Sequence, residues 1–198
     1  AFLAAAIVLA ISPLSPCKAQ ACVGKSLVIG SLNSPNLSVM ADMLCTLITE
    51  RTGTTVVIKG FDDYASLSEA VKKGEVDIMV DFTGRAYTEV LGMAPNTDAA
   101  KVFASVKDIY QREKNLVWLE PLGFSDQSAI SAKGGQTPAI AVPVVRKDTL
   151  NKFPALPRVI NKLAGRIDNG LVAKLAAESK GGQGKKVVRK YLKDNRLI

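Results

Sequence analysis

The amino-acid sequence predicts an α/β fold in which a mainly parallel sheet is flanked by helices. From about residue 26 onward, segments of strand composition alternate with segments of helical periodicity. The run VDIMVDF at residues 76–82 has the length and composition of a central strand, and at Thr83-Gly84 it turns directly into a new helical pattern. Strands and helices that alternate in this way form parallel sheets, which are wound by right-handed crossovers.

The first half of the chain supplies three strands of the predicted sheet. The first helix is opened by a serine and a proline, which suit the cap and the first turn, and glycine ends both helices. The second strand is rich in β-branched residues. In chain order we predict a strand at 26–31, a helix from Ser34-Pro35 to Thr52-Gly53, a strand at 54–59, a turn at 60–64, a helix ending at Gly74 and the strand at 76–82.

The second half of the chain is predicted to complete the sheet and then become helical. The last helices are separated by glycines, and prolines interrupt the first of them. In chain order we predict a helix from Arg85, a turn at 93–96, a helix at about 98–114, strands at 115–120, 127–131 and 139–145, and helices separated by Gly165 and by the glycine cluster at 181–184.

The composition argues against catalysis. The 198 residues include no histidine, which excludes Ser/His and Cys/His catalysis and removes the commonest metal ligand. Asp62, Asp63, Asp77 and Asp81 match no calcium-loop spacing, and turns or hydrogen bonds at strand ends explain them more simply. We therefore predict no enzyme activity, no metal and no cofactor.

The formal net charge of +8 does not indicate nucleic-acid binding. The densest basic cluster, at residues 185–196, alternates with Val187, Val188, Tyr191 and Leu192. This alternation is typical of a helix with one buried and one solvated face, and no nucleic-acid motif accompanies it. We predict no nucleic-acid partner.

Residues 1–21 are predicted to be a secretory signal peptide. Residues 1–14 are almost continuously apolar, and serines, prolines and the small-residue site Ala19-Gln20-Ala21 follow them. A membrane anchor and a lipoprotein remain alternatives, although about 20 apolar residues are needed to span a bilayer. Cleavage after Ala21 would place the protein in the periplasm.

The three cysteines are consistent with export. Removal of Cys17 with the signal leaves Cys22 and Cys45, an even pair in a compartment where disulfides persist. We predict a disulfide between them, which would tie the new N-terminus to the first helix. The alternative is that Cys45 is a small buried thiol and Cys22 is free or acylated.

Four separated blocks of sequence resemble one protein family. They are VIGSLNSPN at residues 28–36, GEVDIMVDFTGRAYTEVL at 74–91, NLVWLEPLGF at 115–124 and PVVRKDTL at 143–150. In this order they resemble the osmoprotectant substrate-binding proteins of ABC importers, of the glycine betaine/choline type. The resemblance implies a type II periplasmic-binding-protein-like fold, a quaternary-ammonium solute and an ABC permease in the inner membrane as partner.

The chain departs from the two-lobed pattern of this family after residue 132. Ala132-Lys133-Gly134-Gly135-Gln136 leads almost directly to residues 139–145, which match the strand that returns from the second lobe. We therefore expect a single lobe. Its parts would be residues 22–132, a glycine-rich junction at 133–138 in place of the second lobe, and the returning strand with C-terminal helices at 139–198.

The resemblance also implies a ligand site made of aromatic rings and polar groups. A quaternary ammonium has no hydrogen-bond donor and is bound by ring faces and burial. The cage tyrosine after the acidic residue at the strand end corresponds to Phe82, which Thr83 follows; core packing is the alternative for Phe82. In the other loops, the family's site positions correspond to Asn33, Leu37, Ser125, Asp126 and Ser128. Independently of the resemblance, Tyr64 is a candidate because its loop also lies at the predicted sheet edge.

An interaction module is the alternative to solute capture. A single lobe could dock on a permease or pair with a second copy of itself to replace the second lobe. An exposed apolar patch at residues 139–145 would favour this alternative, because large exposed patches usually mark contacts.

Overall fold

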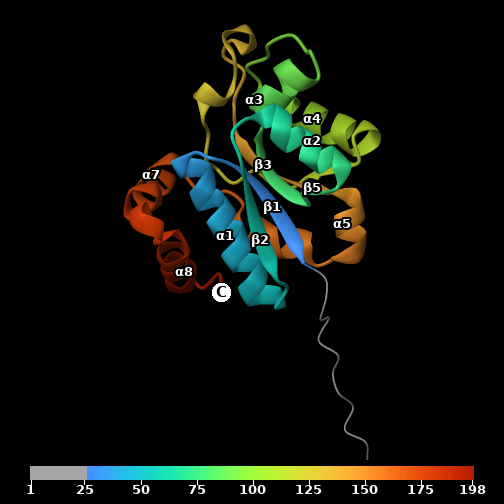
Figure 1. Cartoon of the computed structure of the whole chain (residues 1–198). Coiled ribbons are helices and arrows are strands. Elements are labelled where there is room, and N and C mark those ends of the chain that lie inside the picture. Colours follow the sequence, from blue (N-terminus) through green and yellow to red (C-terminus); the bar gives the residue numbers. More distant parts are fainter. Residues whose placement is uncertain (1–25) are drawn as a thin grey trace, which may run out of the picture.

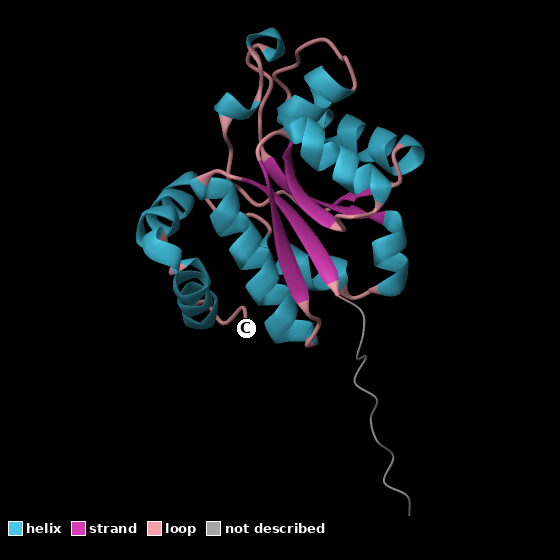
Figure 2. Cartoon of the chain, viewed as in Figure 1, coloured by secondary structure: helices cyan, strands magenta, loops and turns pink. Residues whose placement is uncertain are grey.

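The computed structural model describes residues 26–198, which form one five-stranded sheet between two layers of helices (Figure 1, Figure 2). The predicted signal peptide and Cys22 lie outside the described residues. The sheet has the order β2-β1-β3-β5-β4. Its strands are β1 (Leu27–Leu32), β2 (Val56–Phe61), β3 (Ile78–Phe82), β4 (Leu116–Trp118) and β5 (Ala141–Arg146).

The sheet is mixed, and one strand runs against the others. β1 pairs in parallel with β2 and β3, whereas β5 lies antiparallel between β3 and β4. β4 therefore points the same way as β1, β2 and β3. The predicted α/β class is confirmed, and the first strand lies between the second and the third.

The helices begin and end largely where the caps predict. Ser34 accepts a hydrogen bond from the Leu37 amide at 3.3 Å, and Gly53 and Gly74 end their helices in the left-handed conformation. The helices are α1 (Pro35–Thr52), α2 (Tyr64–Lys73), α3 (Thr83–Arg85), α4 (Ala99–Glu113), α5 (Lys147–Lys152), α6 (Leu156–Ile160), α7 (Asn169–Glu178) and α8 (Gly184–Asp194). Among residues 26–198, no helix has both the length and the apolar content needed to cross a membrane.

Each face of the sheet packs on its own set of helices. On one face, α1 lies against β1 with α6, α7 and α8 beside it, and on the other face lie α2, α3 and α4 (Figure 1). The alternation of β3 shows this division, because Ile78, Val80 and Phe82 enter the first core while Met79 enters the second. Asp81 shares the face of Met79 and is fully buried.

The predicted strand at 127–131 is wrong. A single 3-10 turn occupies Gln127–Ala129, and only an isolated bridge between Ser125 and Ile140 extends the pairing. The Asp126 carboxylate accepts hydrogen bonds from the amide and the hydroxyl of Ser128, at 3.0 and 2.6 Å. This local turn competes with strand pairing, as aspartate and serine often do.

The segment at residues 139–145 is not an exposed apolar patch. Ala139 and Val142 are at most 1% exposed, and β5 as a whole is covered on both faces. Cys45 is also buried, on α1, where its thiol faces the Val56 carbonyl at 3.7 Å. Its predicted bond to Cys22 remains a prediction, since Cys22 is outside the described residues.

Candidate functional site

The loops predicted to hold a ligand meet at one edge of the sheet. β1, β2 and β3 all end there because they are parallel, and the antiparallel β5 begins there opposite Phe82. In Figure 1 these loops lie at the ends of the strands that point toward α3. Ligands of open α/β sheets bind at this edge.

The loop after β1 is held by the loop after β2. The side-chain amide of Asn33 donates a hydrogen bond to the Asp62 carboxylate at 2.7 Å, and both side chains are exposed. Leu37 lies one turn into α1 and is 8% exposed, so it belongs to the core. The edge therefore presents polar groups from Asn33 and Asp62 above an apolar layer.

Phe82 and Thr83 are buried beneath the edge. The Phe82 ring is 1% exposed and packs edge-on against Phe124, with 5.9 Å between the ring centres. The Thr83 hydroxyl donates to the Pro138 carbonyl at 2.6 Å and accepts from the Ile140 amide at 3.0 Å. Thr83 thereby joins the end of β3 to the segment that enters β5.

Residues 125–128 are more exposed than Phe82 and are held by short-range bonds. The Ser125 amide donates to the side chain of Asn169 at 2.9 Å, which connects this loop to α7. Asp126 and Ser128 bond mainly to one another, as described above. Of the predicted site residues, Asn33, Ser125 and Ser128 are exposed and Asp126 is half-buried.

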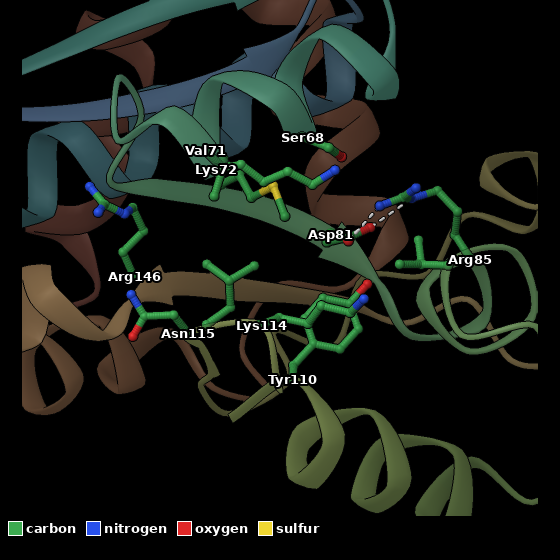
Figure 3. A pocket seen from close by; sticks show the side chains of 12 residues that line it. Ser68, Val71, Lys72, Asp81, Arg85, Tyr110, Lys114, Asn115 and Arg146 are labelled. Atoms are coloured by element: carbon green, nitrogen blue, oxygen red, sulfur yellow. Dashed lines mark hydrogen bonds and ion pairs between the residues drawn. The ribbon is translucent and has the colours of Figure 1, made fainter. Parts of the chain in front are cut away.

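Arg85 is a charged residue of this edge that the sequence reasoning did not assign to the site. Its guanidinium makes two bonds to the Asp81 carboxylate, at 2.8 and 2.6 Å, as Figure 3 shows. The same guanidinium lies 3.9 Å from the centre of the Tyr64 ring. Arg85 thus occupies one face of the ring of Tyr64, the residue that was predicted to belong to the site independently of the family resemblance.

The electrostatics of this trio follow from burial. Burial alone would lower the pKa of Arg85, but the adjacent Asp81 carboxylate raises it, and the net direction is upward. The pKa of Tyr64 is raised above its usual range, mainly by burial and also by Asp81, and its hydroxyl has no hydrogen-bond partner among the described residues. Tyr64 is therefore a neutral ring with a buried polar tip, and Arg85 is a permanent cation.

A spacing signal for Arg85 is present in the sequence. Asp81 and Arg85 are four residues apart, a separation at which opposite charges meet on a helix. This spacing indicates an ion pair only when both residues lie on one helix, and here Asp81 lies in β3 whereas Arg85 lies in α3. The sequence alone therefore did not predict the pair. Among residues 26–198, no group of three or more Cys, Asp or Glu side chains is arranged to hold a metal ion.

Comparison with known proteins identifies the family. Residues 25–140 match the model of the OpuAC family, which is described as the substrate-binding domain of the ABC-type glycine betaine transport system. The match covers more than half of the chain. The chain belongs to the OpuAC family. This is a family of substrate-binding transport proteins and not a class of enzymes, and the resemblance seen in the sequence is confirmed.

Solved structures share the fold of this OpuAC-family chain. A glycine betaine/carnitine/choline ABC transporter structure has a TM-score of 0.76 at 16% identity, covering 87% of this chain and 98% of that one. Apo YehZ from Escherichia coli has a TM-score of 0.73 at 14% identity, covering 87% and 99%. Lactococcal OpuAC, in a closed form with glycine betaine, has a TM-score of 0.52 at 11% identity, covering 87% and 96%. At these identities the likeness shows the fold alone.

Proposed function

We propose that this OpuAC-family domain captures a quaternary-ammonium osmoprotectant of the glycine betaine or choline type in the periplasm and delivers it to an ABC permease. The observation that carries the proposal is the family match over residues 25–140, which includes the loops after β1, β2, β3 and β4. The described fold agrees, since these loops share one edge of the sheet.

We place the ligand over this edge. Its cationic head would approach the face of the Tyr64 ring that Arg85 does not occupy, where the Asp81 carboxylate offsets the charge of Arg85. Its polar groups would approach Asn33, Ser125, Asp126 and Ser128. The remaining predicted residues are buried beneath the ligand position. Leu37 and Phe82 would form an apolar layer under the ligand, and Thr83 would hold the end of β3 in place. One ring contributes about 0.5 to 2 kcal/mol to the binding of a cation, so we expect weak binding by this chain alone.

The proposed mechanism depends on a second surface. Two-lobed binding proteins close around their ligand by a hinge motion, which removes the ligand from water. We propose that residues 133–138 are the junction at which the second lobe would be inserted, which leaves the edge open on one side. An open edge buries less of the ligand, and this lowers affinity further.

Isothermal calorimetry of the full chain with glycine betaine, choline, carnitine and proline betaine tests the capture function. We expect heat of binding with at least one of them, and a loss of about twofold to thirtyfold in affinity when Tyr64→Leu removes the ring. The matched control is Phe103→Leu, because Phe103 is an aromatic on α4 that also has a cation above it, with Lys107 at 5.2 Å. No heat up to millimolar ligand, or equal losses in both variants, would contradict the proposal.

The interaction-module alternative is not favoured by the structure. Its supporting feature was an exposed apolar patch at residues 139–145, and this segment is buried. Pairing with a second copy remains a prediction that a concentration-dependent mass would test.

A further inference from the structure

A cavity of about 410 Å³ lies on the α2 and α4 face of the sheet and meets the edge site at the Asp81–Arg85 pair (Figure 3). Its length follows β3, from the Asp81–Arg85 pair at one end to Asn115 and Arg146 at the other. Arg146 ends β5 and Asn115 precedes β4, so this second end lies at the edge of the sheet opposite to the proposed solute site. The volume lies in the range of small-molecule sites.

The walls of this cavity are largely apolar. Val71 of α2 and Met79 of β3 are buried, at 4% and 3% exposure, and Leu116 of β4 and Val90 complete the apolar lining. The ring of Tyr110 forms part of the α4 wall. Most of Tyr110 is buried, and burial raises the pKa of its hydroxyl, so the ring presents a neutral surface. A ligand of this cavity would therefore have an apolar body.

The charges around the cavity are predominantly positive. Lys72 of α2 and Lys114 at the end of α4 approach it from opposite walls, and Arg146 lies at the end that also holds Asn115. Lys114 has no ion-pair partner among residues 26–198, and Lys72 has only Glu69, at 3.9 Å. Arg146 is paired with Asp148 at 3.1 Å.

The one carboxylate that lines the cavity does not offset these cations. Asp81 is 0% exposed, and both of its oxygens bond to the Arg85 guanidinium. The pair is neutral as a unit, so the lysines determine the sign of the potential that a ligand meets. Positive charge at the rim and an apolar interior together select an amphiphilic anion.

We propose that this cavity is a second ligand site of the domain, which binds a small organic monoanion with an apolar body, such as a medium-chain carboxylate. The carboxylate lies between the Lys72 and Lys114 ammonium groups, and the hydrocarbon lies along Met79, Val71 and the Tyr110 ring. This ligand class is opposite in charge to the quaternary ammonium proposed for the edge, and the two sites are at different places on the sheet.

Calorimetry of the full chain with octanoate tests the proposal, with octyltrimethylammonium as the cationic probe of equal chain length. We expect octanoate to bind, butyrate to bind at least about fivefold more weakly because it buries fewer methylenes, and the cation not to displace bound octanoate. The emission of Trp118 gives a second readout. It is the one tryptophan of the chain and is fully buried, with its ring 5.3 Å from that of Tyr110.

Charge reversal locates the site. We expect Lys72→Glu with Lys114→Glu to weaken octanoate binding at least tenfold, because two attractive charges become repulsive. The matched control is Lys186→Glu with Lys193→Glu, which makes the same charge change on exposed positions of α8 and should leave binding unchanged. Absence of octanoate binding at millimolar concentration, displacement of octanoate by an equal concentration of the cation, or equal effects of the two reversals would overturn the proposal. The octanoate results do not bear on the edge site, because octanoate carries no ammonium group, and the cation is used only as a competitor of octanoate.

Discussion

At the scale of single residues, the Asp81–Arg85 pair is the most tightly constrained charge interaction of the described chain. The two side chains are 0% and 7% exposed, whereas the other ion pairs among residues 26–198 each include a side chain that is at least about half exposed. Exposed pairs contribute little, but removing one partner of a buried pair leaves an uncompensated charge. Asp81 and Arg85 should therefore respond sharply to single substitution.

We predict that Arg85→Met lowers the free energy of unfolding by about 3 to 5 kcal/mol, because Asp81 then remains buried without its cation. Adding Asp81→Asn to this variant should recover part of the loss, since the neutral amide does not need a counter-charge. Urea denaturation of the double variant, both single variants and the unchanged chain measures this coupling. Additive losses would show that the pair is not the cause.

Asp98, the N-terminal cap of α4, should make the stability of the fold depend on pH in the acid range. Its carboxylate accepts from the amides of Lys101 and Ala100, both at 3.1 Å, and the hydrogen bond from Lys101 is the main cause that lowers the pKa of Asp98. A carboxyl with a lowered folded-state pKa stabilises the fold above the unfolded-state value of about 3.9, and this stability is lost as pH falls through the lower pKa.

We predict that Asp98→Asn flattens this dependence, because asparagine caps helices without titrating. Urea midpoints from about pH 5 down to about pH 2 should fall less steeply in the variant than in the unchanged chain. A control with Asp108→Asn, a more C-terminal and exposed aspartate of the same helix that is paired only with Arg112, should follow the unchanged chain more closely. Parallel curves for Asp98→Asn would contradict the assignment.

At the scale of elements, β1 and α2 approach one another closely at Gly30. A methyl group added to Gly30 would meet the Leu67 side chain of α2 and also Val76 Cγ1 at 2.9 Å. We predict that Gly30→Ala lowers the free energy of unfolding by about 1 to 3 kcal/mol through overpacking. Gly170→Ala is the control, because its nearest neighbour is Asp168 Oδ1 at 3.4 Å and alanine favours helix α7. Thermal unfolding that is equal in both variants would argue against the close approach.

The sequence predicted most elements because their signals are local. Ser34, Gly53 and Gly74 each act within one helical turn, and the composition of residues 76–82 is that of a strand covered on both faces. The strand predicted at 127–131 is wrong because another local signal is stronger. The hydrogen bonds from Ser128 to the Asp126 carboxylate turn the backbone within three residues, and the strand prediction did not take them into account.

The candidate sites were less predictable because they are assembled from distant parts of the chain. Tyr64 meets Arg85 only after β3 has been placed beside β1, and Lys72 and Lys114 line one cavity only because α2 and α4 cover the same face of the sheet. The family resemblance predicted which loops reach the edge. It could not show that Phe82 would be 1% exposed, since burial depends on Phe124 and the layers around it.

At the scale of the whole molecule, the last helix completes the core that begins with the first. α8 packs on α1, and the Arg51 side chain at the end of α1 donates to the Leu197 carbonyl at 2.6 Å. Val188 and Leu192 are 0% exposed, while the lysines of α8 lie on its outer face. This confirms the helix with one buried and one solvated face that the basic C-terminal pattern predicted.

The docking of α8 on α1 predicts that the C-terminus is required for the stability of the entire domain. We predict that Leu192→Ala lowers the free energy of unfolding by about 2 to 5 kcal/mol, a large share of the roughly 5 to 15 kcal/mol typical of a domain. The neighbouring exposed change Lys193→Ala should stay within about 0.5 kcal/mol of the unchanged chain. Urea denaturation followed at α8 and at the Trp118 core should then show one common transition, because a helix that shares its core with α1 cannot unfold alone without exposing that core. A separate early transition of α8, with the Trp118 signal unchanged, would mean instead that the sheet and its other helices fold without it.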